Sequence, residues 1–546
     1  MDTISKSRLM TLPKPAKPLL SRRELLANAG LAALALKTRY LEALTGSAPG
    51  TTPTPTPTIV QTPSGALRGE KANGFSVFRG VPFAEPPVGE LRFRPPVPLK
   101  PWSGVRDATH FGPAPYQWHD QSRFNDVLIK HSEDCLYLNI WAPEGKGPFP
   151  VFVWIHGGGY VAGHAFESIF YGDQFAREGV ICVSVAYRLG VFGFLDFGPL
   201  LGAEYNGSGN NALRDLIAAL DWVQKNISAF GGDPHQVTIG GESAGAKLTD
   251  TLMGVPSAEH LFHQMISESG GAERVWSESD ARLVGTAYGR AWVAQASQAG
   301  QPGFTLPGLK TADPDTLIDL QHRFMSDYPY HFPLRCEVDG KTLPRLPVET
   351  VSAGSTKGKR LLIGTNRDES ALFIGAHPTS DPTAKDLGNL PVTAFSQVLE
   401  KYKDVYPQMP DFQRRIRAVT AEEYWVPSTR ILDAHIHGGG TAFMYRLDFV
   451  ETSGRLTGFA YHALDLPLVW EKPHDYAGNV DVELALAKQV HVAWVAFIQG
   501  KTPAAPGLPV WPEYSLNTRA TMVLDTKSRV ESMPNEAELR LWQGVL

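Results

Sequence analysis

A serine in the setting of a nucleophile stands at position 243. Ser243 is the centre of the sequence Gly-Glu-Ser-Ala-Gly (residues 241–245), which follows the apolar segment 236–240 and precedes a helical pattern. A G-x-S-x-G sequence between a strand and a helix forms a tight turn that exposes the serine hydroxyl. The alternative is a glycine-rich turn with no catalytic role, and the flanking strand and helix disfavour this alternative. The sequence therefore predicts that Ser243 is a nucleophile.

A serine nucleophile needs backbone N–H groups that stabilise the oxyanion formed on attack. The sequence His-Gly-Gly-Gly (residues 156–159) directly follows the apolar run Pro150–Ile155. Consecutive glycines let backbone N–H groups approach a substrate without obstruction by side chains. We therefore predict that Gly158, Gly159 and Ala244 donate the oxyanion-hole hydrogen bonds.

The same glycine-rich segment has a competing interpretation as a dinucleotide-binding turn. Gly157, Gly159 and Ala162 have the required spacing after a strand, and Glu178 lies at about the distance, roughly 20 residues, of the acid that binds ribose. That motif must open an amphipathic helix, whereas the residues after Gly159 have a loop-like pattern. The oxyanion interpretation is therefore favoured.

The segments that position these groups alternate between buried strands and amphipathic helices. Residues 210–230 place their apolar side chains on one helical face and are followed by two glycines. Short continuous apolar runs are typical of strands buried on both faces. Such strands are expected at Pro150–Ile155, Val180–Tyr187, Gln236–Gly240, Arg360–Gly364 and Thr441–Phe449. The alternation predicts the α/β class, with a mostly parallel sheet covered by helices on both faces, in one domain over residues 59–546 with helical insertions.

The first 48 residues are predicted to be an export signal. A basic lead contains the pair Arg22-Arg23, and the apolar stretch Leu25–Leu36 that follows is too short to span a bilayer. The pair resembles a twin-arginine signal, although Leu25 stands where phenylalanine is usual; the alternative is a soluble helix with an incidental arginine pair. A Thr/Pro-rich linker follows at residues 49–58. We expect a periplasmic or secreted protein without a stable membrane span after signal cleavage.

Composition limits the partners and cofactors. The 546 residues include 51 Lys and Arg against 56 Asp and Glu, for a net charge of -5, which disfavours nucleic acid as a partner. Three cysteines without a Cys-x-x-Cys pair exclude a disulfide scaffold and a zinc ribbon. His435 and His437 stand beside three glycines and are expected in a loop rather than in a metal site. No metal or organic cofactor is predicted.

Several long motifs, in order along the chain, resemble the type-B carboxylesterase/cholinesterase-like family. They are FRGVPFAEPPVGELRFRPP (78–96), SEDCLYLNIWAP (132–143), WIHGGGYVAG (154–163), AYRLGVFGFL (186–195) and NISAFGGDPHQVTIGGESAG (226–245). The resemblance extends from about Thr58 to the C-terminus. It implies an α/β-hydrolase fold and hydrolysis of small-molecule esters through Ser, Glu and His in that chain order.

The resemblance also implies the other two catalytic residues. The segment GFAYHALDLPLVW (458–470) is similar to the family segment that carries the catalytic histidine, which points to His462. The acid has two adjacent candidates, Asp368 and Glu369, either of which could orient the imidazole and stabilise its charged form. The family resemblance favours Glu369, although Ser370 replaces the usual glycine. In a turn, adjacent side chains diverge, so only one of the two acids is expected to face His462.

Departures from the family pattern lead to further expectations. Cys135 lacks the upstream cysteine to which the family usually bridges it, so it is expected to be a free, buried thiol. Lys247, one helical turn after Ser243, either touches an acidic leaving group or is a packing or surface lysine. Glu242 resembles the acid beside the nucleophile in cholinesterases and could affect the field at the imidazolium.

Two rival functions are a non-catalytic binding or adhesion protein of this fold and a hydrolase of amides, carbamates or lactones.

Export can be tested through the arginine pair. Replacing Arg22 and Arg23 with lysine should leave the precursor in the cytoplasm, because twin-arginine transport requires the pair. Fractionation of cells that express the wild-type and variant chains measures this. Unchanged export of the variant would contradict the twin-arginine prediction.

Overall fold

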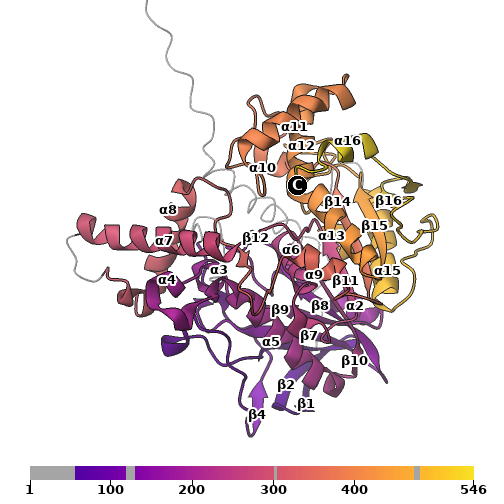
Figure 1. The fold of residues 1–546 in the computed structure, drawn as a ribbon. Coiled ribbons are helices and arrows are strands. Elements are labelled where there is room, and N and C mark those ends of the chain that lie inside the picture. The colour runs from indigo at the N-terminus through magenta and orange to yellow at the C-terminus, as the bar shows by residue number, and fades with distance from the viewer. Residues whose placement is uncertain (1–55, 119–128, 300–303, 473–479) are drawn as a thin grey trace, which may run out of the picture. The chain divides into compact units, whose positions relative to one another are not determined.

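The computed structural model describes residues 56–118, 129–299, 304–472 and 480–546 (Figure 1). The predicted export signal at residues 1–48 lies outside these ranges, as does most of the predicted linker at 49–58. Strand β1 (Thr56–Thr62) begins inside that linker rather than at Ile59. Pro57 cannot donate a backbone hydrogen bond, and it is tolerated because β1 is an edge strand that pairs only with β2.

Thirteen strands of the described residues form one sheet, in the order β1-β2-β3-β7-β9-β8-β10-β11-β14-β15-β16-β17, with β4 paired to β2. Besides β1, the strands are β2 (Gly65–Ala72), β3 (Phe75–Pro82), β4 (Val105–Asp107), β7 (Tyr137–Pro143), β8 (Phe149–Ile155), β9 (Ile181–Val185), β10 (Gly232–Glu242), β11 (Gln264–Glu268), β14 (Arg360–Asn366), β15 (Thr441–Leu447), β16 (Thr521–Leu524) and β17 (Arg529–Glu531). Pairing is parallel from β9 through to β16 and antiparallel between neighbours from β1 to β9 and between β16 and β17. The mostly parallel α/β sheet is thus confirmed.

Two short pairs of strands lie outside this sheet, and helices make up much of the remaining chain. The pairs are β5 (Ala114–Pro115) with β6 (His131–Ser132), and β12 (Val275–Trp276) with β13 (Cys336–Glu337). The helices are α2 (Asp173–Arg177), α3 (Val191–Phe194), α4 (Gly198–Leu201), α5 (Asn211–Asn226), α6 (Ala244–Leu252), α7 (Glu278–Ala299), α8 (Pro314–Asp327), α9 (Pro347–Ser352), α10 (Ala371–Ile374), α11 (Val392–Val405), α12 (Asp411–Thr420), α13 (Val426–His437), α14 (Leu466–Val469), α15 (Val480–Ile498) and α16 (Glu536–Leu541). None of the helices in the described ranges is long and apolar enough to cross a membrane.

Alternate residues of the central strand β8 pack into two separate hydrophobic cores. On β8, Val151, Val153 and Ile155 pack in the core that contains α5 and α6, whereas Phe152 and Trp154 pack in the core that contains α2, α14 and α15. This period-two division explains why β8 is a continuous apolar run, because both of its faces are covered by helices. Figure 1 places the early strands β1, β2 and β4 away from the late strands β14, β15 and β16, beside which α15 lies.

The predicted helix over 210–230 is α5 followed by a short 3-10 segment at Ile227–Phe230. Gly231 then stops it in the left-handed region, with φ 84°. The prediction of a loop around His435 and His437 is wrong, because both residues lie in the last turn of α13. The glycines that follow end this helix instead. The His435 ring is buried and contacts the Thr356 hydroxyl at 2.7 Å.

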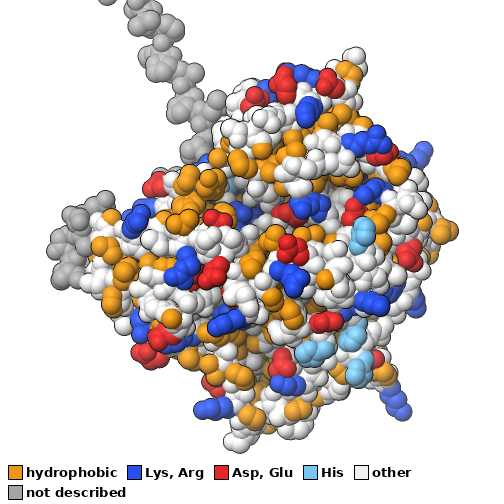
Figure 2. Space-filling view, in the orientation of Figure 1, with side chains coloured by type: hydrophobic (Ala, Val, Ile, Leu, Met, Phe, Trp, Pro, Cys, Tyr) orange, Lys and Arg blue, Asp and Glu red, His pale blue; other side chains and the backbone are white. Residues whose placement is uncertain are grey.

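Charged side chains of both signs are interspersed on the face of the molecule shown in Figure 2. Nucleic-acid binding uses clustered Lys and Arg along one surface. The absence of a nucleic-acid partner stays a prediction from the composition.

The cysteines give a direct test of the expected departure from the family. Cys135, Cys182 and Cys336 are all free and buried, and burial raises the pKa of each thiol. Thiol titration of the denatured, unreduced protein should therefore find three thiols per chain, and the native protein should react slowly because the thiols are covered and protonated. Fewer than three thiols after denaturation would reveal a disulfide and contradict the structure.

Candidate active site

Four neighbouring parallel strands bring the predicted site residues to one edge of the sheet. Strands β10, β11, β14 and β15 are consecutive in the sheet order, so their carboxyl ends lie side by side. Ser243 follows β10, Glu369 follows β14, and His462 lies in the segment after β15. Ligands and reacting groups of α/β proteins gather at this edge because the connections there can vary without disturbing the strands.

Ser243 occupies the strained turn that the motif predicts. Its backbone has φ 56° and ψ -122°, and α6 begins at the next residue. The Ser243 N–H donates to the Glu268 carbonyl at the end of β11, 2.9 Å away. A Cβ on Gly241 or Gly245 would collide with the carbonyl oxygen of Ile155, so the turn requires glycine at both positions. The strain is concentrated at the one residue whose hydroxyl must stand clear of the sheet.

Glu369, rather than Asp368, contacts the imidazole. His462 Nδ1 lies 2.6 Å from Glu369 Oε2, and the His462 N–H donates to the Glu369 carbonyl at 3.2 Å. The other carboxylate oxygen accepts from Ser269 Oγ at 2.5 Å and from the Asn366 N–H at 2.7 Å. Each oxygen of this fully buried carboxylate is therefore held, which fixes the direction in which it presents a lone pair to the ring.

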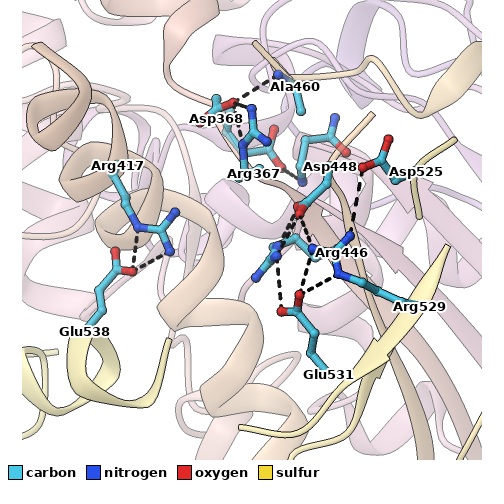
Figure 3. A network of polar contacts seen from close by, with 12 residues as sticks. Arg367, Asp368, Arg417, Arg446, Asp448, Ala460, Asp525, Arg529, Glu531 and Glu538 are labelled. Atoms are coloured by element: carbon cyan, nitrogen blue, oxygen red, sulfur yellow. Dashed lines mark hydrogen bonds and ion pairs between the residues drawn. The ribbon is translucent and has the colours of Figure 1, made fainter. Parts of the chain in front are cut away.

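Asp368 has a different task, which Figure 3 shows. Its carboxylate accepts from the Arg367 guanidinium at 2.8 Å and from the Ala460 N–H at 3.1 Å. The Asp368 N–H donates in turn to the Ala460 carbonyl at 2.9 Å. Residues 368 and 369 thus fasten two points, two residues apart, of the segment that carries His462. The expected divergence of the two acids is what the structure shows.

The second ring nitrogen of His462, Nε2, lies against Glu242. Glu242 Oε1 lies 3.1 Å from His462 Nε2, although without hydrogen-bond geometry. Among the described residues no hydrogen bond joins Ser243 to His462. Burial alone would lower the pKa of His462, but the carboxylates of Glu242 and Glu369 outweigh it and raise the pKa. Burial raises the pKa of Glu242, which opposes its ionisation beside the ring.

The glycine-rich segment after β8 lies against Ser243. A Cβ on Gly157 would lie 3.2 Å from the Ser243 Cβ. Gly158 and Gly159 have φ 109° and 62°, which turn the backbone in a way that other residues rarely adopt. The segment is anchored by the Tyr187 hydroxyl, which donates to the His156 carbonyl at 2.7 Å. The next α-helix, α2, begins only at Asp173, so no α-helix opens at Gly159 as dinucleotide binding would require.

Lys247 is a packing lysine, the second of the two alternatives considered for it. Its ammonium group is buried and donates to the carbonyls of Gly270 and Glu423, each at 2.9 Å. It also forms an ion pair with the Glu423 carboxylate at 3.2 Å. Within the described residues, no group of three His, Cys, Asp or Glu side chains is placed to hold a metal ion.

Ser269 and Tyr424 are among the contacts of the site that were not anticipated from the sequence. Ser269, which holds Glu369, lies directly after β11 and has a positive φ of 59°, and only its place at a strand end could have signalled it. Tyr424 places its ring 4.7 Å from the His462 ring, centroid to centroid. Its position in a helix far from any motif gives no sequence signal.

Serine hydrolases with the α/β-hydrolase fold place nucleophile, acid and histidine at this sheet edge in this chain order, and this chain has the fold of that class. The Carboxylesterase family matches residues 56–542. The para-nitrobenzyl esterase of Bacillus subtilis (strain 168) is 34% identical over 494 residues, which cover 88% of this chain and 97% of that protein. Carboxylesterase 1D of Rattus norvegicus is 33% identical over 518 residues, covering 84% and 88%. A Geobacillus stearothermophilus carboxylesterase structure superposes with a TM-score of 0.77 at 33% identity, covering 89% of this chain and all of that one, 100%.

The chain belongs to the carboxylesterase family. It is therefore a carboxylic ester hydrolase of the α/β-hydrolase fold, and the family acts on small-molecule esters.

The two adjacent acids allow a paired test. Glu369→Gln should lower kcat by up to about 10⁴-fold while the protein stays folded, because an amide cannot hold the imidazole in the required tautomer. Asp368→Asn should lower the melting temperature and reduce kcat much less, since it weakens the attachment of the segment at Ala460. Steady-state kinetics and thermal unfolding of both variants measure this. If Asp368→Asn loses more kcat than Glu369→Gln, the orienting acid is Asp368 and the choice of Glu369 is wrong.

Proposed function

We propose that the protein hydrolyses esters through an acyl-enzyme intermediate, with Ser243 as nucleophile, His462 as general base and acid, and Glu369 as the orienting acid. The observation that carries this proposal is the 2.6 Å contact between His462 Nδ1 and a carboxylate that Ser269 and Asn366 hold in place. A histidine oriented in this way at the edge of the nucleophile turn suits proton transfer at its other nitrogen, Nε2.

In the first half of the reaction, the Ser243 hydroxyl oxygen attacks the ester carbonyl carbon as its proton passes to His462 Nε2. The imidazole must leave its contact with Glu242 for this transfer, because Nε2 cannot face both groups. Negative charge develops on the carbonyl oxygen, where the N–H groups of Gly158, Gly159 and Ala244 would stabilise it. The tetrahedral intermediate collapses as His462 returns the proton to the leaving alcohol, and the acyl group remains on Ser243.

In the second half, water takes the place of the alcohol. His462 accepts a proton from the water, whose oxygen attacks the acyl carbon, and then protonates Ser243 Oγ as the carboxylic acid departs. Glu369 need not take a proton at any stage, because its role is to orient the ring and stabilise its charged form. Each oxyanion donor is expected to contribute about 100- to 1000-fold in rate.

We also propose that this hydrolase works outside the cytoplasm. Support comes from the arginine pair Arg22-Arg23 and the short apolar stretch after it, both in the predicted signal at residues 1–48. Twin-arginine transport carries folded proteins, which suits a large domain with three free thiols. The predicted destination is the periplasm or the medium.

Covalent labelling separates an active serine from a lost one. A fluorophosphonate should attach to Ser243 in the wild-type protein, and Ser243→Ala should lose both the label and at least about 10³-fold of its activity on p-nitrophenyl esters. Ser528→Ala is a matched control, because Ser528 lies in the turn between β16 and β17 and donates only to the local Asp525 carbonyl at 3.1 Å. It should keep both. A label elsewhere, or full activity of Ser243→Ala, would contradict the assignment.

The same assay tests which type of bond the protein cleaves. The p-nitrophenyl esters of acids from acetate to palmitate should be cleaved much faster than the p-nitroanilides of the same acids, since the chain belongs to an esterase family. Faster cleavage of the anilides would favour the amide-hydrolase alternative and leave the triad assignment intact.

A further inference from the structure

A rare helical distortion borders the active site. Residues Ala421–Trp425 form a π-helical turn between α12 and α13, and all five are buried. Single π-helical turns inside α-helices are uncommon and occur frequently at functional sites, because they shift the register of the side chains that follow. This turn must therefore be held by interactions that outweigh its poorer hydrogen-bond geometry.

Buried charges hold one side of the turn. The Glu423 carboxylate contacts both the Lys247 ammonium on α6, at 3.2 Å, and the guanidinium of Arg274, in the segment between β11 and β12. Lys247 also donates to the Glu423 carbonyl at 2.9 Å, so it grips the backbone of the turn as well as its side chain. Burial would raise the pKa of Glu423, but Arg274 and Lys247 outweigh it and lower the pKa, which keeps the carboxylate ionised.

Backbone amides hold the other side. The Glu422 carboxylate accepts hydrogen bonds from three consecutive N–H groups, those of Gly388 at 3.0 Å, Asn389 at 2.6 Å and Leu390 at 2.7 Å. Adjacent acids of one turn are thus fastened to different parts of the chain. Buried ions contribute little net stability because their desolvation is costly, so such an arrangement is better explained by a need to fix geometry.

The fixed turn presents Tyr424 to the catalytic histidine. The Tyr424 ring lies 4.7 Å from the His462 ring at an interplanar angle of 35°, and the Lys247 ammonium lies 4.9 Å from the same tyrosine ring. Lys247 follows Ser243 by one turn of α6. The element that starts at the nucleophile therefore supports, through Glu423, the ring that packs on the base.

We propose that Lys247, Glu423 and Arg274 form a buried brace that holds the π-helical turn so that Tyr424 packs against the His462 imidazole, which makes Tyr424 a positioning residue for proton transfer. The inference rests on the proposed role of His462 and deepens it. The brace has no contact with substrate in this scheme and acts only through the tyrosine ring.

The physical effect follows from the charge of the imidazolium. His462 becomes positively charged in each half of the reaction, and an aromatic face attracts a cation while the packed ring restricts rotation of the imidazole. The charged and titratable groups that face His462 are Glu242 from β10, Glu369 after β14, Asp465 on its own segment, and Tyr424 from the turn. Loss of the tyrosine ring leaves the carboxylates in place, as well as the Phe373 ring, whose centroid lies 5.1 Å from that of His462, and removes only the contribution of Tyr424.

The decisive variant is Tyr424→Leu, compared with Tyr424→Phe. Tyr424→Leu should lower kcat by about two- to thirtyfold with little change in KM, the range expected for loss of a cation–aromatic interaction. A less stabilised imidazolium has a lower pKa, so the acid limb of the kcat/KM profile should move to lower pH. Tyr424→Phe keeps the ring and should restore most of the activity and the wild-type profile.

The brace is tested by Glu423→Gln, with Glu133→Gln as a matched control. Glu423→Gln should reproduce the lower kcat and the shifted acid limb, because the turn loses its ionic attachment. Glu133 forms a largely buried ion pair with Arg92, which also donates to the Leu309 and Ala312 carbonyls. Its variant should lower the melting temperature without moving the pH profile.

The outcomes distinguish this inference from the proposed function. An inactive wild-type protein would overturn the Ser243 mechanism itself. An active wild type with an unchanged kcat and acid limb in Tyr424→Leu would overturn only the role of Tyr424. If Tyr424→Leu does not fold, two measurements replace it: the kinetics of Tyr424→Met and an NMR titration of His462 in Glu423→Gln. An imidazole pKa in Glu423→Gln equal to that of the wild type would contradict the proposal.

Discussion

The end of strand β11 is the point on which the site depends. Its last residue, Glu268, accepts the Ser243 N–H through its carbonyl, and the next residue, Ser269, donates its hydroxyl to Glu369. One dipeptide therefore fixes the Ser243 turn on one side and Glu369 on the other. This is possible only because β10, β11 and β14 are parallel and adjacent, with Glu242 opposite Glu268 and Glu268 opposite Gly364.

Precision at the histidine comes from short local attachments rather than from the sheet. His462 lies in an irregular segment, and a loop of that kind is ordinarily mobile. Asp368 and Glu369 together bind Ala460 and His462 through both backbone and side-chain groups. Adjacent acids with different partners thus attach the loop at two points, Ala460 and His462.

The sequence predicted the parts of the site that local geometry dictates. A strand, a tight glycine turn and a helix must expose Ser243, and the family resemblance selected Glu369 over Asp368. Ser269 and Tyr424 were missed because their roles depend on contacts between distant segments: Ser269 is 100 residues from Glu369 in the chain. The start of β1 at Thr56 was missed for a related reason. A Thr/Pro sequence can form a strand only at the edge of a sheet, and β1 is such an edge strand because it pairs only with β2.

The electrostatics of the site reconcile two opposing needs. Glu242 and Glu369 raise the pKa of His462, which makes it a stronger base and favours its charged form. In the proposed mechanism the ring must also accept a proton, and too many ionised acids around it would keep it protonated. Burial raises the pKa of Glu268 and of Asp465, so these neighbouring acids lose their protons less readily than exposed ones. The fold can therefore surround one histidine with carboxyl groups while one of them, Glu369, contacts the ring directly and orients it.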